Sequence, residues 1–179
     1  QCLQLRVEDI ENKLGVWGFV VRRRKALDQK VKNDTSLRFV PIAKPVLDAG
    51  FLKYVDDVRS SGHSRLFPNL PNSTGLGFGR QLSRQFSAYL KKECGIEDAG
   101  LGFHAFRHTF ASELDRKKVT INTIASITGH ATKSKSEAPT LSEVYIEKII
   151  PDQVEGLAKF RPLVELSAYK KGMFKRQLR

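Results

Sequence analysis

The spacing of hydrophobic and polar positions changes along the chain, from short apolar runs near the N-terminus to helical periodicity further on. Two runs of β-branched and aromatic residues, at 16–21 (VWGFVV) and 37–42 (LRFVPI), are typical of strands. A polar, basic segment separates them, and a further short strand is expected near Lys30 to Lys32. The pattern predicts a small antiparallel sheet near the N-terminus.

From Pro45 onward, apolar residues recur at the spacing of one helix face, which predicts a helix over 45–61. A second helix is expected over 80–95, where a glycine follows two lysines, and three more over 104–117, 120–128 and 141–148. Tyr54 and Tyr89 are expected in the core or at its edge. The predicted fold class is therefore α+β, mainly α, with the small antiparallel sheet followed by a helical bundle.

The pattern divides the chain into a domain over residues 1–160 and a basic C-terminal tail over 161–179. After Pro162 the tail has little apolar periodicity, so we expect it to be mobile or to dock only on a partner. There is no internal repeat and no low-complexity tract.

Charge indicates the kind of partner. The 179 residues carry 31 Lys and Arg against 19 Asp and Glu, a net charge of +12 at pH 7. This excess is typical of proteins that neutralise nucleic-acid phosphates, although a diffuse basic surface would give the same total. Cys2 and Cys94 lie far apart and indicate neither a disulfide framework nor a zinc site. With no apolar run long enough for a membrane span and no signal peptide, the expected location is the cytoplasm.

The segment HAFRHTFASEL, residues 104–114, concentrates cationic side chains on one predicted helix. An apolar stripe expected to face the core consists of Phe103, Phe106, Phe110 and Leu114. His104 and Arg107 are neighbours just beyond the edge of this stripe, and His108 lies further round. Three interpretations are open: an ordinary polar face, a metal pair of His104 and His108, or a clamp for an anion. The metal interpretation lacks a third ligand, so no metal is predicted.

Downstream motifs favour the clamp. His130 lies in ITGHATK, and Tyr145 lies in the helix-like segment LSEVYIEKI. The ordered set HxxRH, then GH, then tyrosine resembles the C-terminal catalytic domain of the tyrosine recombinases, the phage integrase family. Two earlier segments strengthen the resemblance. The first, LRVEDI, is similar to the family's LxxxDI segment. The β-hairpin pattern of the family is matched by Lys32, Ser36, Arg38, Val40 and Pro41.

The resemblance implies a chemistry without metal, ATP or other cofactor. Tyr145 would attack a DNA phosphodiester to give a 3′-phosphotyrosyl bond and a free 5′-hydroxyl. With a pKa of about 10, a tyrosine is almost wholly protonated at neutral pH, and His104 would act as base or proton shuttle. Arg107 and His130 would stabilise the charge that develops on the phosphate. His108 would support the helix.

The leaving 5′-oxygen needs a proton, and the resemblance assigns this role to Lys32. Lys30 remains an alternative, because strand alternation would place both lysines on the same face. The DNA- or phosphate-binding set implied by the resemblance comprises His104, Arg107, His130, Lys30, Lys32 and Arg38. Tyr169, in the basic tail, is a distant second candidate for the nucleophile.

The chain departs from the family pattern in two places. The first catalytic arginine of the family would lie three residues upstream of Gln1, so we expect little or no strand cleavage from these 179 residues alone. His130 and Tyr145 are fifteen positions apart, an interval longer than is usual in the family. The added polar stretch is either a tether that withdraws the tyrosine or a family variation.

The resemblance implies site-specific recombination or integration, with double-stranded attachment-site DNA and other integrase subunits as partners, in a tetramer on DNA. A prophage or another integrative element acting at the bacterial nucleoid is the expected context, without a membrane partner. Two alternatives are a type IB topoisomerase-like enzyme and a DNA-binding module that has lost catalysis.

Overall fold

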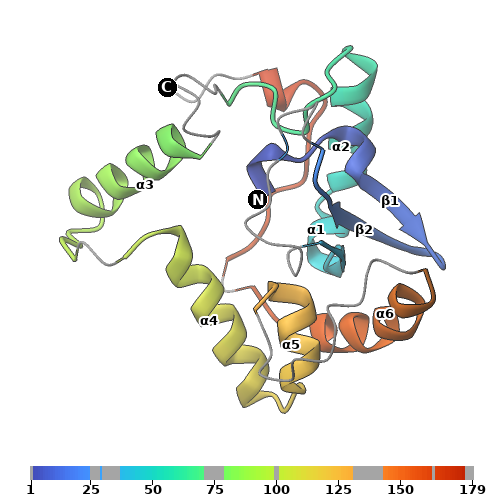
Figure 1. Cartoon of the computed structure of the whole chain (residues 1–179). Coiled ribbons are helices and arrows are strands. Elements are labelled where there is room, and N and C mark those ends of the chain that lie inside the picture. Colours follow the sequence, from blue (N-terminus) through green and yellow to red (C-terminus); the bar gives the residue numbers. More distant parts are fainter. Residues whose placement is uncertain are drawn as a thin grey trace.

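The computed structural model of the chain describes residues 2–24, 29, 37–70, 79–98, 101–130, 143–162 and 164–175, with the backbone alone for residues 143–146. The predicted fold class is confirmed: a small antiparallel sheet near the N-terminus is followed by helices (Figure 1). The helices are α1 (Lys44–Asp48), α2 (Phe51–Ser60), α3 (Arg80–Lys92), α4 (Phe103–Arg116), α5 (Ile121–Thr128) and α6 (Glu143–Ala158). In the part of the chain described, none of them combines the length and apolar character needed to cross a membrane.

The sheet consists of β1 (Ile10–Lys13), β2 (Val16–Val21) and β3 (Arg38–Pro41), antiparallel and in that order. The two strands predicted from apolar runs are confirmed as β2 and β3. β1 was not anticipated, because its sequence IENK lacks apolar alternation and it is held by backbone pairing with β2. The turn at Leu14–Gly15 has positive φ at both residues, as a tight hairpin requires. The strand expected near Lys30–Lys32 lies outside the described residues.

The first core lies where α1 and α2 cover the N-terminal segment and the sheet. Its buried members are all aliphatic: Leu5, Val7, Ile10, Ile42, Val55, Val58 and Leu66. The prediction of one continuous helix over 45–61 is wrong, because α1 ends at Asp48 and α2 begins at Phe51. Gly50, at φ 88°, takes the left-handed conformation that breaks the helix between them.

The C-terminal tail packs on this first core. The Tyr169 N–H donates to the carbonyl of Ala49 at 2.7 Å. Its hydroxyl donates to Asp57 Oδ2 at 2.6 Å, and the Gly172 N–H donates to the same oxygen at 2.6 Å. Phe174, in the short 3-10 helix Met173–Lys175, packs against the aliphatic cluster. Residues 164–175 therefore dock on the chain's own α2, which corrects the expectation of a mobile or partner-bound tail.

The second core joins α4, α5 and α6 to the sheet. Its buried members are Leu114, Val119, Ile124, Ile127 and Leu157, and next to it Phe39 of β3 packs with Val20 and Ile150. The buried amide of Gln153 donates from Nε2 to the Phe39 carbonyl at 3.2 Å and to Ser126 Oγ at 3.1 Å. This amide links α6 to β3 and α5. α6 also continues through Pro151, well beyond the predicted end at residue 148.

Helix α3 stands apart from the sheet and the first core (Figure 1). None of its residues is buried, and Phe86 stacks on Phe103 of α4 with ring centroids 4.5 Å apart. Phe103 and Phe106 are 42% and 59% exposed, so the prediction that they face the core is wrong for both. Tyr89 is 55% exposed, which also corrects its predicted place at the core edge. The apolar faces of α3 and α4 cover each other only in part.

Candidate functional site

Helix α5 determines where His130 lies. The hydroxyl of Thr120 accepts a hydrogen bond from the Thr123 N–H at 3.2 Å and so caps the start of the helix. The helix ends at Gly129, whose φ of 72° turns the chain out of the helix, with its N–H donating to Ala125 at 2.7 Å. His130 follows directly, so its side chain leaves from the C-terminal end of α5.

Helix α4 brings its cations to the same place. Arg107 donates from Nε to His130 Nε2 at 3.0 Å. The His104 and His108 rings, one helical turn apart, have centroids separated by 4.9 Å, and the His108 and His130 rings are 6.4 Å apart. The structure thus brings Arg107 and His130 into direct contact, and His104 joins them through His108.

Thr128 holds the other side of the His130 ring. Its Oγ1 lies 2.8 Å from His130 Nδ1 and donates to the carbonyl of Ile124 at 2.7 Å. Thr128 is 8% exposed, so its hydroxyl is buried in the α5 end. Both ring nitrogens of His130 therefore have protein partners, which fixes the plane of the imidazole.

Arg38 braces the turn from the sheet. Its Nε donates to the Ile127 carbonyl at 3.2 Å, and its Nη2 lies 3.5 Å from the Thr128 carbonyl. A Cβ built on Gly129 would lie 2.7 Å from the Arg38 Cζ atom, so the guanidinium packs directly on the glycine. Burial lowers the pKa of Arg38; Cys2 opposes this effect, and the charge of Arg107 adds a smaller lowering. The phosphate-binding role expected of Arg38 stays a prediction, and its contacts with α5 are what the structure shows.

The electrostatic environment of His130 favours its neutral form. Partial burial lowers the pKa of its imidazole, and the charges of Arg107, His108, His104 and Arg38 lower it further. An anion placed beside the ring would oppose these effects. The site is therefore cationic around an uncharged imidazole, an arrangement suited to a bound phosphate.

The side chains of three predicted site residues are not described by the structure. Lys30 and Lys32 lie outside the described residues. Tyr145 lies in α6, where the backbone alone is described. The second candidate for the nucleophile, Tyr169, is placed on α2 by its hydrogen bond to Asp57. Among the described residues there is no group of three or more His, Cys, Asp or Glu that could hold a metal ion.

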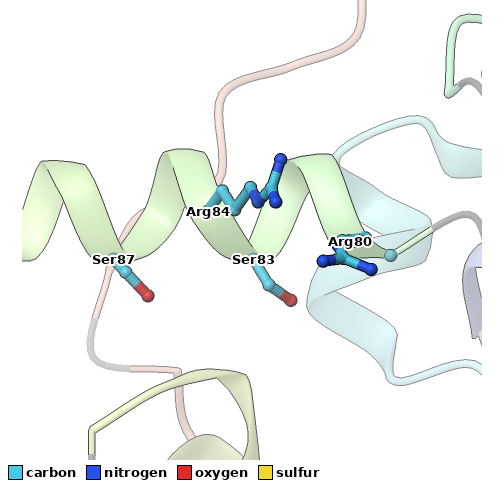
Figure 2. A pocket seen from close by; sticks show the side chains of 5 residues that line it. Arg80, Ser83, Arg84 and Ser87 are labelled. Carbon is cyan, nitrogen blue, oxygen red and sulfur yellow. The ribbon is translucent and has the colours of Figure 1, made fainter. Parts of the chain in front are cut away.

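A second polar surface lies on α3. A hollow of about 700 Å³ is lined by Gly79, Arg80, Ser83, Arg84 and Ser87, none of them a predicted catalytic residue. The four side chains follow one another along α3, with both serine hydroxyls directed to the same side (Figure 2). At 100° per residue they span an arc of about 100°, beside the apolar face of the helix. These residues stand at helical spacing in the sequence, but they belong to none of the motifs that indicated the catalytic residues.

Fold and site together define a mixed α/β domain with a cationic arginine–histidine centre of the kind that binds phosphate. The Phage integrase family matches residues 1–138, and the chain belongs to this family of tyrosine recombinases. As a member of this family, the protein binds DNA and belongs to the proteins of site-specific recombination and integration. Comparison with curated proteins and with solved structures found no significant match.

Proposed function

We propose that this domain recombines DNA by transesterification, with Tyr145 as the nucleophile and a 3′-phosphotyrosyl intermediate. The observation that carries the proposal is the contact between Arg107 Nε and His130 Nε2 at 3.0 Å, which joins two motifs 23 residues apart. A guanidinium has five N–H donors, so the other four of Arg107 are suited to two oxygens of a phosphodiester. His104, one turn before His108, is the proton shuttle of the proposal.

The remaining steps use residues whose side chains the structure does not describe. Lys32, or Lys30 in its place, protonates the leaving 5′-oxygen, and no metal or cofactor takes part. The substrate is attachment-site DNA of a prophage or another integrative element at the bacterial nucleoid. The active assembly is a tetramer of integrase subunits on that DNA. The family match to residues 1–138 supports this context.

The polar face of α3 extends the proposed DNA surface. Arg80, Ser83, Arg84 and Ser87 offer guanidinium and hydroxyl donors in a row on an exposed helix. Such donors make most of the contacts to DNA phosphates in protein–DNA complexes, and they set position and affinity more than sequence choice. We therefore assign this face to the sugar–phosphate backbone beside the cleavage point.

A nicked suicide substrate tests the catalytic proposal in the intact protein. Cleavage of such a DNA releases a short strand, so the covalent protein–DNA product accumulates and is read on a denaturing gel. Tyr145→Phe should abolish this product and leave DNA binding nearly unchanged, since only the phenolic oxygen is removed. Tyr89→Phe removes a hydroxyl from the exposed α3 and is the matched control, with trapping expected as in the wild type.

The outcomes separate the competing functions. Persistent trapping in Tyr145→Phe would show that another residue is the nucleophile. DNA binding without trapping in the wild type would identify a DNA-binding module without catalysis. Relaxation of any supercoiled DNA, without recombination of two matched sites, would favour a type IB topoisomerase-like enzyme.

A further inference from the structure

The proton on the His130 ring can be assigned from the chemistry of its partners. Arg107 Nε carries a hydrogen and has no lone pair to offer, so it donates to His130 Nε2 at 3.0 Å. Nε2 must therefore be the unprotonated nitrogen. In a neutral imidazole the single N–H is then at Nδ1.

Thr128 completes the same assignment from the other side of the ring. Its hydroxyl hydrogen is directed to the Ile124 carbonyl at 2.7 Å, which is a donor-to-acceptor bond in one direction only. The lone pairs of Oγ1 remain to accept from His130 Nδ1 at 2.8 Å. The hydrogen bonds thus run from His130 to Thr128 to the α5 backbone. Thr128 is 8% exposed, so water does not readily replace it.

We propose that Thr128 is a positioning residue of the site: its buried hydroxyl, together with the Arg107 Nε–H, holds neutral His130 as the Nδ1–H tautomer, so His130 must gain a proton from solvent before Nε2 can donate to a phosphate. The inference rests on the proposed function for the identity of the anion. The tautomer itself follows from the hydrogen bonds at His130.

The groups that face His130 make proton uptake depend on the anion. Arg107, His104 and His108 come from α4, and Arg38 comes from β3; with burial they lower the pKa of His130. A bound anion offsets these positive charges and raises that pKa. Proton uptake on binding means that affinity for the anion increases as the pH falls. Between the pKa of free His130 and its raised pKa in the anion-bound form, the loss of affinity approaches about tenfold per pH unit.

The tautomer is measured in the protein labelled with ¹⁵N-histidine, by the chemical shifts and couplings of the two ring nitrogens, with His130 assigned by His130→Gln. Wild type and Thr128→Ser, which keeps the hydroxyl, should show the Nδ1–H form above the pKa. Thr128→Val has nearly the same shape but no acceptor for Nδ1–H, so only the Arg107 N–H still favours that form and its share should fall. Thr123→Val removes another buried hydroxyl from α5 without touching His130 and is the matched control.

Predominant Nε2–H in the wild type, or an unchanged tautomer in folded Thr128→Val, would overturn the proposal. Should Thr128→Val unfold, the wild-type tautomer alone still decides the assignment, because the Nε2–H form contradicts it directly.

Proton uptake is measured with inorganic sulfate, which carries two charges throughout the range of histidine titration. Sulfate should raise the pKa of His130 in the wild type and in Thr123→Val. In Thr128→Val the affinity for sulfate should depend less on pH, since Nε2–H is then available without protonation. A wild-type His130 pKa unchanged by saturating sulfate would refute the coupling.

These readouts are independent of DNA cleavage. If the tautomer and sulfate results hold while the nicked substrate is not trapped, the proposed recombination fails and the positioning role of Thr128 stands. If trapping occurs and the tautomer is Nε2–H, the inference about Thr128 fails and the proposed function stands.

Discussion

Gly129 is the position where the fold and the candidate site can be perturbed together. Its φ of 72° lies in the left-handed region, which costs a residue with a Cβ about 1–2 kcal/mol. A Cβ there would also lie 2.7 Å from both Cζ and Nη1 of Arg38. Because the guanidinium ends a flexible side chain, we expect Arg38 to move and the backbone to stay in place. Gly129→Ala therefore combines backbone strain with the loss of the Arg38 contacts to α5.

The size of the second effect follows from the two carbonyls that Arg38 approaches, at 3.2 Å and 3.5 Å. A hydrogen bond from a charged donor contributes about 1.5–3 kcal/mol, and the longer contact contributes little. Losing the Arg38 contacts to α5 should lower the free energy of unfolding by about 1–2 kcal/mol, since the displaced guanidinium regains some hydration. With the left-handed strain, Gly129→Ala should lower the free energy of unfolding by about 2–4 kcal/mol.

Gly62→Ala is the matched control. Gly62 follows α2 at φ 80°, and a Cβ there meets no atom within 4 Å. Both variants carry the same left-handed strain and the same change in the unfolded chain. The difference between their free energies of unfolding therefore measures the contribution of the Arg38 contacts. We expect Gly62→Ala to cost about 1–2 kcal/mol, which is the strain alone.

The assay is urea unfolding followed by far-ultraviolet circular dichroism, with the free energy obtained by linear extrapolation. In an Arg38→Ala background, Gly129→Ala should cost no more than Gly62→Ala, because the clashing group is gone. Equal costs for the two glycine variants in the wild-type background would refute the idea that Arg38 braces the turn before His130.

The remaining predictions concern the tail, the DNA surface and the two ends of α4. The hydroxyl of Tyr169, then the Gly172 N–H, lowers the pKa of Asp57. These hydrogen bonds therefore stabilise the folded state above the ordinary carboxyl pKa, and their contribution is lost as the pH falls through the lowered pKa. Tyr169→Phe should unfold at a lower urea concentration than the wild type at pH 7. On acidification its free energy of unfolding should fall less than that of the wild type. Arg84→Ala should reduce the slope of log affinity for DNA against log salt by about 0.9, while Arg84→Lys preserves it, as measured by fluorescence anisotropy. Leu114→Ala should cost about 2–5 kcal/mol in urea unfolding, whereas Phe106→Ser, at a side chain 59% exposed, should cost far less. Equal costs at these two positions would show that the apolar stripe of α4 is buried throughout.

The parts of the fold predicted from sequence are those that depend on local spacing. β2 and β3 coincide with apolar runs, and α5 ends at Thr128, which is the expected end. β1 could not be predicted in this way, because its polar residues pair through the backbone with β2. The division between α1 and α2 depends on the φ of Gly50, and a single glycine does not reveal its dihedral angle in a sequence.

The candidate site divides along the same line. Histidine and arginine motifs directed attention to Arg107 and His130, which the structure brings within hydrogen-bonding distance. The supports of His130 could not be found from motifs. Arg38 lies 89 residues before its acceptor at Ile127, and only the packing of β3 on α5 brings them together. Thr128 appears in the sequence as an ordinary helix residue, and its role follows from the direction of its hydroxyl bond to the helix backbone.

The uneven packing of α4 explains why the site depends on these supports. Leu114 near the end of α4 is wholly buried, and Phe110 packs against the same core. Nearer its start, Phe103 and Phe106 meet α3 and solvent instead of the core. Arg107 lies between these two parts, where apolar burial no longer fixes the helix. Its hydrogen bond to His130 therefore holds this part of α4 in place, as core packing does further along the helix. The position of Arg107 then depends on the rigidity of the turn at the end of α5. Because hydrogen-bond geometry is directional and burial is not, a site held in this way is sensitive to single hydroxyl and guanidinium groups.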